Sequence, residues 1–379
     1  MPNFWSSAPT ISVCLSRRSD NFLLLRFIAA SLVAFSHSYD TLGPSGDFLM
    51  RMPGNIGFNF GITAVSMFFF ISGFLVAGSY IRRRDLFAFV RSRVLRIVPA
   101  YVVCVVLCAL VVGLLCTTSG WVDYLRDPAT RSYVITNLGF NHLQWGLPGV
   151  FADNPHPDNV NASLWTLPGE VRMYLYVAAL GAIGIFSRRW IANTALIALA
   201  LFGIFAPTSL PLLDYPDHFL PLAALFAAGA FCYVNRNWIP VCGYTATALF
   251  AMAIAAHGYA VYKPLALASL AYFCLWFAYR TPWRSFNRFG DYSYAIYLWN
   301  WPVQQTLVHF FKMDQPLLMF VVSYPLILGI AVLSWRWVEK PALGFKSRTF
   351  GSGSEADTDP DRTSAGATTI ASVTEGGPR

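Results

Sequence analysis

The feature that most constrains the fold of this chain is a series of apolar stretches, each long enough to cross about 30 Å of hydrocarbon as a helix. Hydrophobic residues make up 56% of the chain and charged residues only 12%, which is typical of membrane proteins. The sequence therefore predicts an all-α fold, a polytopic membrane helical bundle of about ten transmembrane helices. The ten stretches lie at residues 22–38, 59–80, 97–116, 172–186, 190–206, 217–235, 242–257, 264–279, 291–310 and 316–336.

The distribution of basic residues indicates how these helices cross the membrane. If both termini are cytoplasmic, all but six of the 27 lysines and arginines lie on the cytoplasmic side, as the positive-inside rule requires for an even number of spans. The net charge of +8 is then a consequence of topology. No nucleic-acid partner is expected, because these charges sit in short loops rather than on one basic face. The six outer residues are Arg51, Arg126, Arg131, Arg172, Lys263 and Lys312.

Composition divides the chain into three parts: a cytoplasmic N-terminal tail (1–21), a membrane domain (22–345) and a disordered cytoplasmic C-terminal tail (349–379). The last part is dominated by small and polar residues that cannot bury a core. No cleavage site precedes the first apolar stretch, so we expect it to remain as a span. The seven cysteines lack paired CxxC spacing, so neither a disulfide framework nor a metal site is expected.

The first apolar stretch contains one arginine and one histidine, Arg26 and His37. Eleven helical steps of about 100° end only about 20° past three full turns, so the two side chains share a helix face about 16 Å apart. Ionisable residues inside a membrane are costly and indicate a functional site. Two simpler interpretations stay open: Arg26 as a side chain reaching the interface, and His37 as a packed polar residue.

A second basic cluster follows the second stretch, where Arg93 and Arg96 share a predicted helix face with Phe89. Their planar guanidinium groups suit phosphate oxygens, so the partner is either an anionic lipid headgroup or a bound polyphosphate. Small residues Ser72 and Gly73 in the second stretch favour close helix packing, and a nucleophilic Ser72 is the minor alternative.

The only long loop between spans, residues 117–170, is predicted on the outer side. Loops of this length in a compact bundle are usually functional. Glu170 stands at the start of the fourth stretch, where capping of the helix dipole is the simpler explanation for a carboxylate. Trp165 and Tyr174 are either interfacial aromatics or a platform for a sugar ring.

Taken together, these motifs resemble the acyltransferase 3 family of integral membrane O-acyltransferases, over about residues 20–345. The family's usual fold is a ten-helix bundle with cytoplasmic ends, which agrees with the prediction above. Many members have a histidine where this chain has Asn300, so we assign that residue no acid–base role. The motifs are Arg26 with His37, FFFISGF at Phe68 to Phe74, RVLRIVPAY at Arg93 to Tyr101, SLWTLPGE at Ser163 to Glu170, YSYAIYLW at Tyr292 to Trp299 and VEKP at Val338 to Pro341.

The resemblance implies transfer of an acetyl group from acetyl-CoA, a co-substrate rather than a tightly bound cofactor, to a sugar hydroxyl. The branch with an amide at position 300 is similar to bacterial enzymes that acetylate exopolysaccharide, lipopolysaccharide O-antigen or the fucose of nodulation factors. This implies the bacterial inner membrane, a glycan or lipid-linked sugar acceptor, and contact with the lipid bilayer.

The resemblance also implies roles for individual residues. Arg26, Arg93 and Arg96 are expected to hold the CoA phosphates, and His37 to act as general base on the sugar hydroxyl. Glu170 is expected to orient the imidazole or to bind the acceptor. A metal site is not expected, because the sequence has no second histidine at ligand spacing. The candidate acceptor-binding residues are Trp165, Asn161 and Tyr174.

A transporter of a glycan or small molecule is the alternative function, because an arginine and a histidine in a bundle could line a substrate path. That alternative predicts internal repeats or paired broken helices, and residues 1–190 show no convincing similarity to residues 191–345. A non-catalytic partner of a synthase complex would leave the shared face of Arg26 and His37 unexplained.

Overall fold

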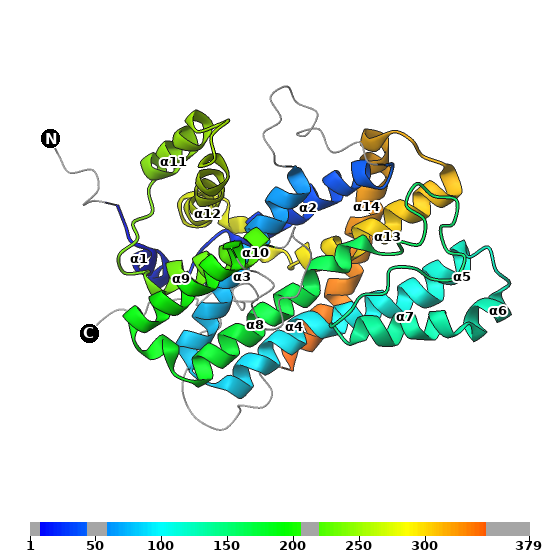
Figure 1. The fold of residues 1–379 in the computed structure, drawn as a ribbon, viewed down its shortest axis with the longest axis horizontal. Coiled ribbons are helices and arrows are strands. Elements are labelled where there is room, and N and C mark those ends of the chain that lie inside the picture. Colours follow the sequence, from blue (N-terminus) through cyan, green and yellow to red (C-terminus); the bar gives the residue numbers. More distant parts are fainter. Residues whose placement is uncertain (1–7, 44–58, 206–219, 346–379) are drawn as a thin grey trace, which may run out of the picture.

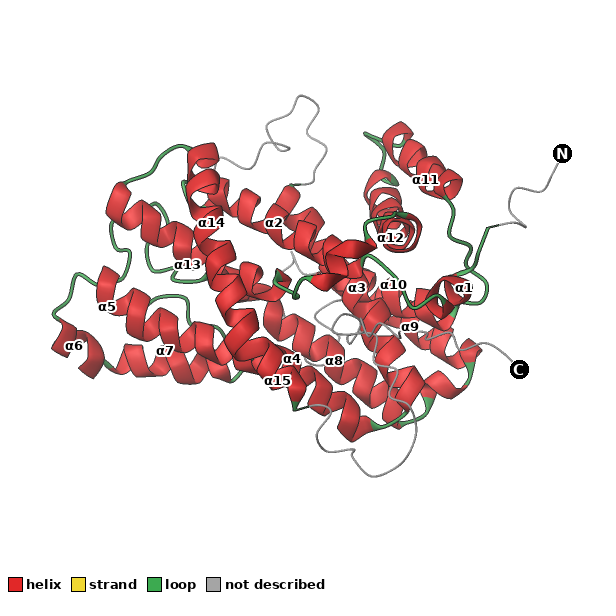
Figure 2. Cartoon of the chain, turned by 180° about the vertical axis from the view of Figure 1, so that it is seen from behind, coloured by secondary structure: helices red, strands yellow, loops and turns green. Residues whose placement is uncertain are grey.

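The structure, a computed structural model, describes residues 8–43, 59–205 and 220–345. Within these ranges the regular secondary structure is helical, apart from two isolated β-bridges, which confirms the all-α prediction. The short hairpin of α6 and α7 lies at one end of the molecule and α1 and α9 at the opposite end (Figures 1 and 2). Between these ends, α4 and α8 lie side by side in both views.

The α-helices are α1 (Ile11–Ser16), α2 (Phe22–Asp40), α3 (Phe60–Arg83), α4 (Leu86–Leu107), α5 (Gly113–Cys116), α6 (Trp121–Arg126), α7 (Pro128–Leu138), α8 (Leu167–Ala182), α9 (Arg189–Phe205), α10 (Leu220–Val234), α11 (Gly243–Ala255), α12 (Tyr262–Arg280), α13 (Ser293–Phe311), α14 (Pro316–Ser334) and α15 (Lys340–Gly344). Two π-helical turns, η1 (Cys108–Val112) and η7 (Trp335–Glu339), continue α4 and α14, and 3-10 turns include η2 (Ala162–Thr166), directly before α8.

Each of the ten predicted apolar stretches overlaps a helix, and the ends of two of them, 190–206 and 217–235, lie outside the described residues. Four continuous helices in the described ranges are long and apolar enough to cross a membrane: Phe22–Asp40, Phe60–Arg83, Leu86–Cys116 and Pro316–Gly344. Shorter apolar helices accompany them, including α9, α10 and α11. The chain is therefore a multi-pass membrane protein, while the number of ten spans and the cytoplasmic position of both termini stay predictions.

The turn between α3 and α4 follows directly from three residues. Arg84 adopts a left-handed conformation (φ 51°) that ends α3. The next residue, Asp85, caps α4, because its carboxylate accepts a hydrogen bond from the amide of Ala88 at 2.9 Å. The tight turn places the arginine-bearing first half of α4 beside the end of α3.

Helices α3 and α10 pack closely through a reciprocal pair of glycines. A Cβ atom on Gly73 would lie 1.9 Å from the carbonyl oxygen of Phe226, and a Cβ on Gly229 would lie 2.1 Å from that of Phe70. Only glycine allows the two backbones this approach. The sequence-based interpretation of Gly73 as a packing residue agrees with this contact.

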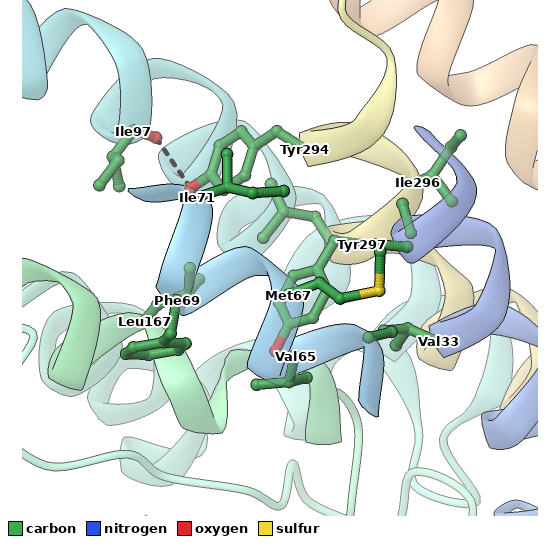
Figure 3. Packing of buried hydrophobic residues seen from close by; sticks show 14 of the residues in the cluster. Val33, Val65, Met67, Phe69, Ile71, Ile97, Leu167, Tyr294, Ile296 and Tyr297 are labelled. Atoms are coloured by element: carbon green, nitrogen blue, oxygen red, sulfur yellow. Dashed lines mark hydrogen bonds between the residues drawn. The ribbon is translucent and has the colours of Figure 1, made fainter. Parts of the chain in front are cut away.

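The buried core takes residues from many helices, and Figure 3 shows a part of it with labelled residues from α2, α3, α4, α8 and α13. Val33 of α2, Met67 of α3 and Tyr297 of α13 lie close together in this view. Tyr294 of α13 donates a hydrogen bond from its hydroxyl to the carbonyl oxygen of Ile97 in α4, at 3.1 Å. This contact joins α13 to α4 two residues before Pro99, the proline inside α4.

The long stretch predicted as an outer loop differs from that expectation in its last part. Residues Asn161, Ser163 and Thr166 are buried, and Asn161 donates to the carbonyl oxygen of Leu298 in the middle of α13 at 3.0 Å. The Thr166 hydroxyl also lies 2.6 Å from that of Tyr297. The segment thus enters the bundle and lies along α13, because its amides and hydroxyls find partners there.

The part of the predicted N-terminal tail that the structure describes is packed against the bundle. The amides of Ile11 and Ser12 donate to the carbonyl oxygens of Ile239 and Arg236, both at 3.0 Å, and Ile11 is fully buried. This segment is therefore tied to the connection between α10 and α11. The predicted C-terminal tail, 349–379, lies outside the described residues.

Candidate functional site

The polar residues singled out in the sequence gather around α13. Helix α2 presents Arg26 near the start of α13 and His37 near its middle. Their partners, Asp291 and Asn300, are nine residues apart, or about 14 Å along a helix. Arg26 and His37 therefore lie on the face of α2 that is turned toward α13, as the spacing predicts.

The imidazole of His37 is partly buried and its Nδ1 hydrogen-bonds the side-chain oxygen of Asn300. The Asn300 amide nitrogen donates to the carbonyl oxygens of Tyr297 at 2.7 Å and Ile296 at 3.1 Å. Because both N–H groups of the amide are used, its oxygen faces His37 and can only accept. Nδ1 therefore carries the proton, and Nε2 of the neutral ring is left as the basic nitrogen.

The segment before α8 completes the surroundings of this amide. Ser163, fully buried, has its hydroxyl 3.5 Å from the Asn300 oxygen. Asn161 caps η2, the turn that contains Ser163, since its side-chain oxygen accepts a hydrogen bond from the Ser163 backbone amide at 3.1 Å. On the other side, the ring of Trp301 meets His37 edge-on, with ring centroids 5.1 Å apart. These contacts hold the imidazole in one orientation.

A second group lies at the start of α13, where two arginines meet one carboxylate. Arg26 from α2 donates to Asp291 Oδ2 at 2.7 Å, and Arg96 from α4 hydrogen-bonds the same oxygen. The positive charges of Arg26 and Arg96 and the hydrogen bonds from Ser293 all stabilise the negatively charged form of the Asp291 carboxylate.

Glu339 brings a second carboxylate to Arg96, with Oε2 3.9 Å from Nη1. The π-helical turn η7 ends at Glu339, whose side chain is only 2% exposed. Its other oxygen accepts from the Ser334 hydroxyl at 3.1 Å. Such turns shift the register of a helix and occur often at functional sites. Here the shifted residue is an acid directed at a candidate donor-binding arginine.

A third group surrounds Glu170 in the first turn of α8, where a negative charge is favoured by the helix dipole. Its Oε1 accepts hydrogen bonds from the Tyr174 hydroxyl at 2.5 Å and the Ser72 hydroxyl at 3.1 Å. The Arg93 guanidinium carbon lies 5.8 Å from the ring centroid of Tyr174 and 5.9 Å from that of Phe89. Among the described residues, Arg93 forms no ion pair.

The structure brings together some of the predicted site residues and separates others. Among the described residues the side-chain hydrogen bonds of Glu170 go to Ser72 and Tyr174, and that of His37 goes to Asn300. Trp165 packs partly buried against the core, Asn161 is bonded to α13, and Tyr174 lies beside Arg93. Each of the three candidate acceptor-binding residues thus has its own partner in the bundle, and their role in acceptor binding stays a prediction.

Sequence reasoning did not single out three residues of these groups: Asp291, Ser163 and Glu339. Asp291 is the first residue of the predicted apolar stretch 291–310, and an acid at the end of such a stretch was the available signal. Glu339 follows the last stretch within the motif VEKP, but only the π-helical turn directs it inward. Ser163 has no signal of its own, because its place depends on the segment entering the bundle.

Comparisons with known proteins give one family model and two relatives. A family model described as an acyltransferase domain matches residues 20–336. An O-acetyl transferase of Shigella phage Sf6 is 27% identical over 341 residues, covering 85% of this chain and 96% of the relative. Nodulation protein 10 of Rhizobium leguminosarum bv. viciae is 30% identical over 364 residues, covering 88% and 95%. No solved structure matches the chain significantly.

Proposed function

This chain belongs to the acyltransferase 3 family of membrane O-acyltransferases, and on that basis we propose that it moves an acetyl group from acetyl-CoA to a sugar hydroxyl of a bacterial glycan. A relative named O-acetyl transferase supports acetyl as the transferred group. The acceptors proposed are exopolysaccharide, lipopolysaccharide O-antigen and nodulation-factor fucose. The proposed location is the bacterial inner membrane, with ten spans and both termini cytoplasmic.

The observation that carries the proposal is the His37–Asn300 pair. A hydroxyl attacks a thioester only if its proton is removed as the new bond forms, and this requires a positioned base. Asn300 holds the proton on Nδ1 of His37 and leaves Nε2 able to accept another. The Asn300 amide uses both of its N–H groups elsewhere, so it fixes the tautomer of His37. A histidine that is only a packed polar residue has no need of a fixed tautomer.

In the proposed reaction, His37 Nε2 accepts the proton of the sugar hydroxyl while the sugar oxygen bonds to the thioester carbonyl carbon. The tetrahedral intermediate then collapses as the C–S bond breaks. The departing CoA sulfur takes the proton from the imidazolium, so His37 returns to its starting form and no oxidant or reductant is needed. The Asn300 oxygen accepts from Nδ1 throughout and keeps the ring in place.

Donor binding is proposed at the start of α13, where Arg26 and Arg96 both contact Asp291. Arg93 lies three residues before Arg96 in α4 and is proposed as a third donor-binding residue. Guanidinium groups bind phosphate oxygens through charge-assisted hydrogen bonds that a neutral sugar could not replace. The pantetheine arm would then extend from this cluster to His37, a distance of about 14 Å along α13.

For the acceptor side we propose Glu170, Trp165, Asn161 and Tyr174 as contributors. Support for Glu170 comes from its two hydroxyl donors, Ser72 and Tyr174, which fix the position of its carboxyl group. Trp165 offers an aromatic ring that is only partly buried. A sugar binds to such combinations of a ring face and fixed polar groups.

The proposal is tested by His37→Ala, with the exposed outer residue His142→Ala as matched control. We expect the first variant to lose acetyl ester from surface and secreted glycans, with protein level and glycan export unchanged, and the second to behave as wild type. Mass analysis of the glycans measures both. Loss of export with acetylated glycan retained inside the cell would instead favour the transporter.

A further inference from the structure

Asp291 is held more firmly than an ordinary surface acid. Its Oδ1 accepts hydrogen bonds from the Ser293 hydroxyl at 2.5 Å and the Ser293 amide at 3.2 Å. Ser293 is the first residue of α13 and is fully buried. A carboxylate bonded to the first turn of a helix is also favoured by the helix dipole. The side chain is therefore fixed relative to α13.

The other oxygen, Oδ2, is shared by two arginines from different helices, Arg26 of α2 and Arg96 of α4. Two guanidinium groups this close would repel each other without the carboxylate between them. Each guanidinium carries five N–H donors, and the bond to Oδ2 uses only part of them. Asp291 thus orients both groups. Arg96 also has Glu339 beside it, with Oε2 3.9 Å from Nη1, and Arg26 is the group whose other N–H donors remain for a further anion.

We propose that Asp291 is a positioning residue that holds Arg26 and Arg96 in the arrangement that binds the phosphates of the acyl donor. This inference rests on the proposed function, since it assumes a phosphate-bearing donor at this cluster. If Asp291 positions the two arginines, removing its charge should weaken the binding of the negatively charged donor. If only the net charge of the cluster mattered, removing Asp291 would strengthen donor binding, because the cluster would become more positive.

The test measures acetyl-CoA binding to the purified full chain in lipid nanodiscs, for wild type and Asp291→Asn. We expect the dissociation constant to rise about ten-fold, the loss of roughly one charge-assisted hydrogen bond, although the net charge becomes more positive. S-acetylpantetheine, which carries the thioester without the nucleotide phosphates, is titrated in parallel. Its binding should stay unchanged, whereas a merely disrupted structure would weaken both ligands.

Asp85→Asn is the matched control, because it removes one exposed charge at the start of α4 and retains a good capping residue. It should leave acetyl-CoA binding within about two-fold of wild type. Ser293→Ala keeps both ion pairs and removes only one bond to Oδ1, so we expect a weaker change of about three-fold in the same direction. This variant decides the question if Asp291→Asn fails to fold.

The possible results separate the two proposals. Equal or tighter binding of acetyl-CoA by Asp291→Asn, or no change in Ser293→Ala when Asp291→Asn is unfolded, would overturn the positioning role and leave the proposed function intact. If wild type binds S-acetylpantetheine and acetyl-CoA equally well, the phosphates are not recognised at all. Absence of acetyl-CoA binding by wild type would overturn the proposed function, and the positioning role with it.

Discussion

His37 Nδ1 hydrogen-bonds the side-chain oxygen of Asn300, because the Asn300 amide nitrogen already donates to two backbone carbonyl oxygens of its own helix. A neutral amide can fix the tautomer of an imidazole without adding a charge beside it. A carboxylate at the same place would orient the ring equally well but would stabilise the protonated form. The imidazole on α2 is therefore oriented by a partner that carries no charge.

This relationship predicts the effect of Asn300→Asp on the pH dependence of the reaction. The carboxylate would stabilise the imidazolium, so the acidic limb of the kcat profile should move to higher pH by about one unit or more. Measurement of kcat between pH 5 and pH 9 tests this shift. Asn300→Ala, which removes the orienting group, should instead lower kcat about 10- to 100-fold without a comparable shift. An unchanged profile in both variants would show that Asn300 does not act on His37.

Arg93 should contribute to donor binding through its charge. Its Nε donates to the Ser92 hydroxyl at 3.2 Å and the rings of Phe89 and Tyr174 lie beside it, but it forms no ion pair within the described residues, so we expect its other N–H groups to bind an anion. Arg93→Gln should raise the KM for acetyl-CoA about ten-fold, with a smaller change in kcat. Arg83→Gln, which changes an exposed arginine at the end of α3, is the control and should have little effect. Equal effects of the two changes would point to a general surface charge.

Glu170→Gln separates the donor side of the site from the acceptor side. The amide has nearly the same shape but loses the charge that receives bonds from Ser72 and Tyr174. If Glu170 binds the sugar, the KM for the acceptor should rise about ten-fold and the KM for acetyl-CoA should stay constant. Steady-state kinetics with each substrate varied in turn measures both constants. A change confined to the KM for acetyl-CoA would instead assign Glu170 to the support of Tyr174 and Arg93.

The parts of this structure that follow from local pattern could be predicted from the sequence. Apolar length located the helices, and helical spacing placed Arg26 and His37 on one face, because both depend only on neighbours within a few turns. The partners of these residues are more than 250 positions away, at Asp291 and Asn300. No periodicity specifies such a pairing, which depends on how α2 and α13 pack.

The segment before α8 shows a second limit of local reasoning. A polar stretch with prolines reads as an outer loop, since backbone groups and polar side chains normally remain in water. Asn161 and Ser163 enter the bundle only because α13 offers a carbonyl and an amide oxygen at matching positions. The π-helical turn that directs Glu339 inward is equally a product of packing and leaves no distinct pattern in the sequence.

The contact between α3 and α10 predicts a large loss of stability on adding a single methyl group. In Gly73→Ala the new Cβ would lie 1.9 Å from the Phe226 carbonyl oxygen, far inside van der Waals contact, and the opposing atom is backbone that cannot rotate away. The helices must separate, at a cost of about 3 kcal/mol, the upper end for overpacking. Gly329→Ala in α14 is the control: its Cβ would meet nothing within 4 Å, and alanine favours a helix over glycine. Thermal unfolding of the two purified variants in detergent should therefore differ in direction, with Gly73→Ala less stable than wild type and Gly329→Ala at least as stable. Similar melting temperatures for Gly73→Ala and wild type would mean that α3 and α10 are not in this close contact.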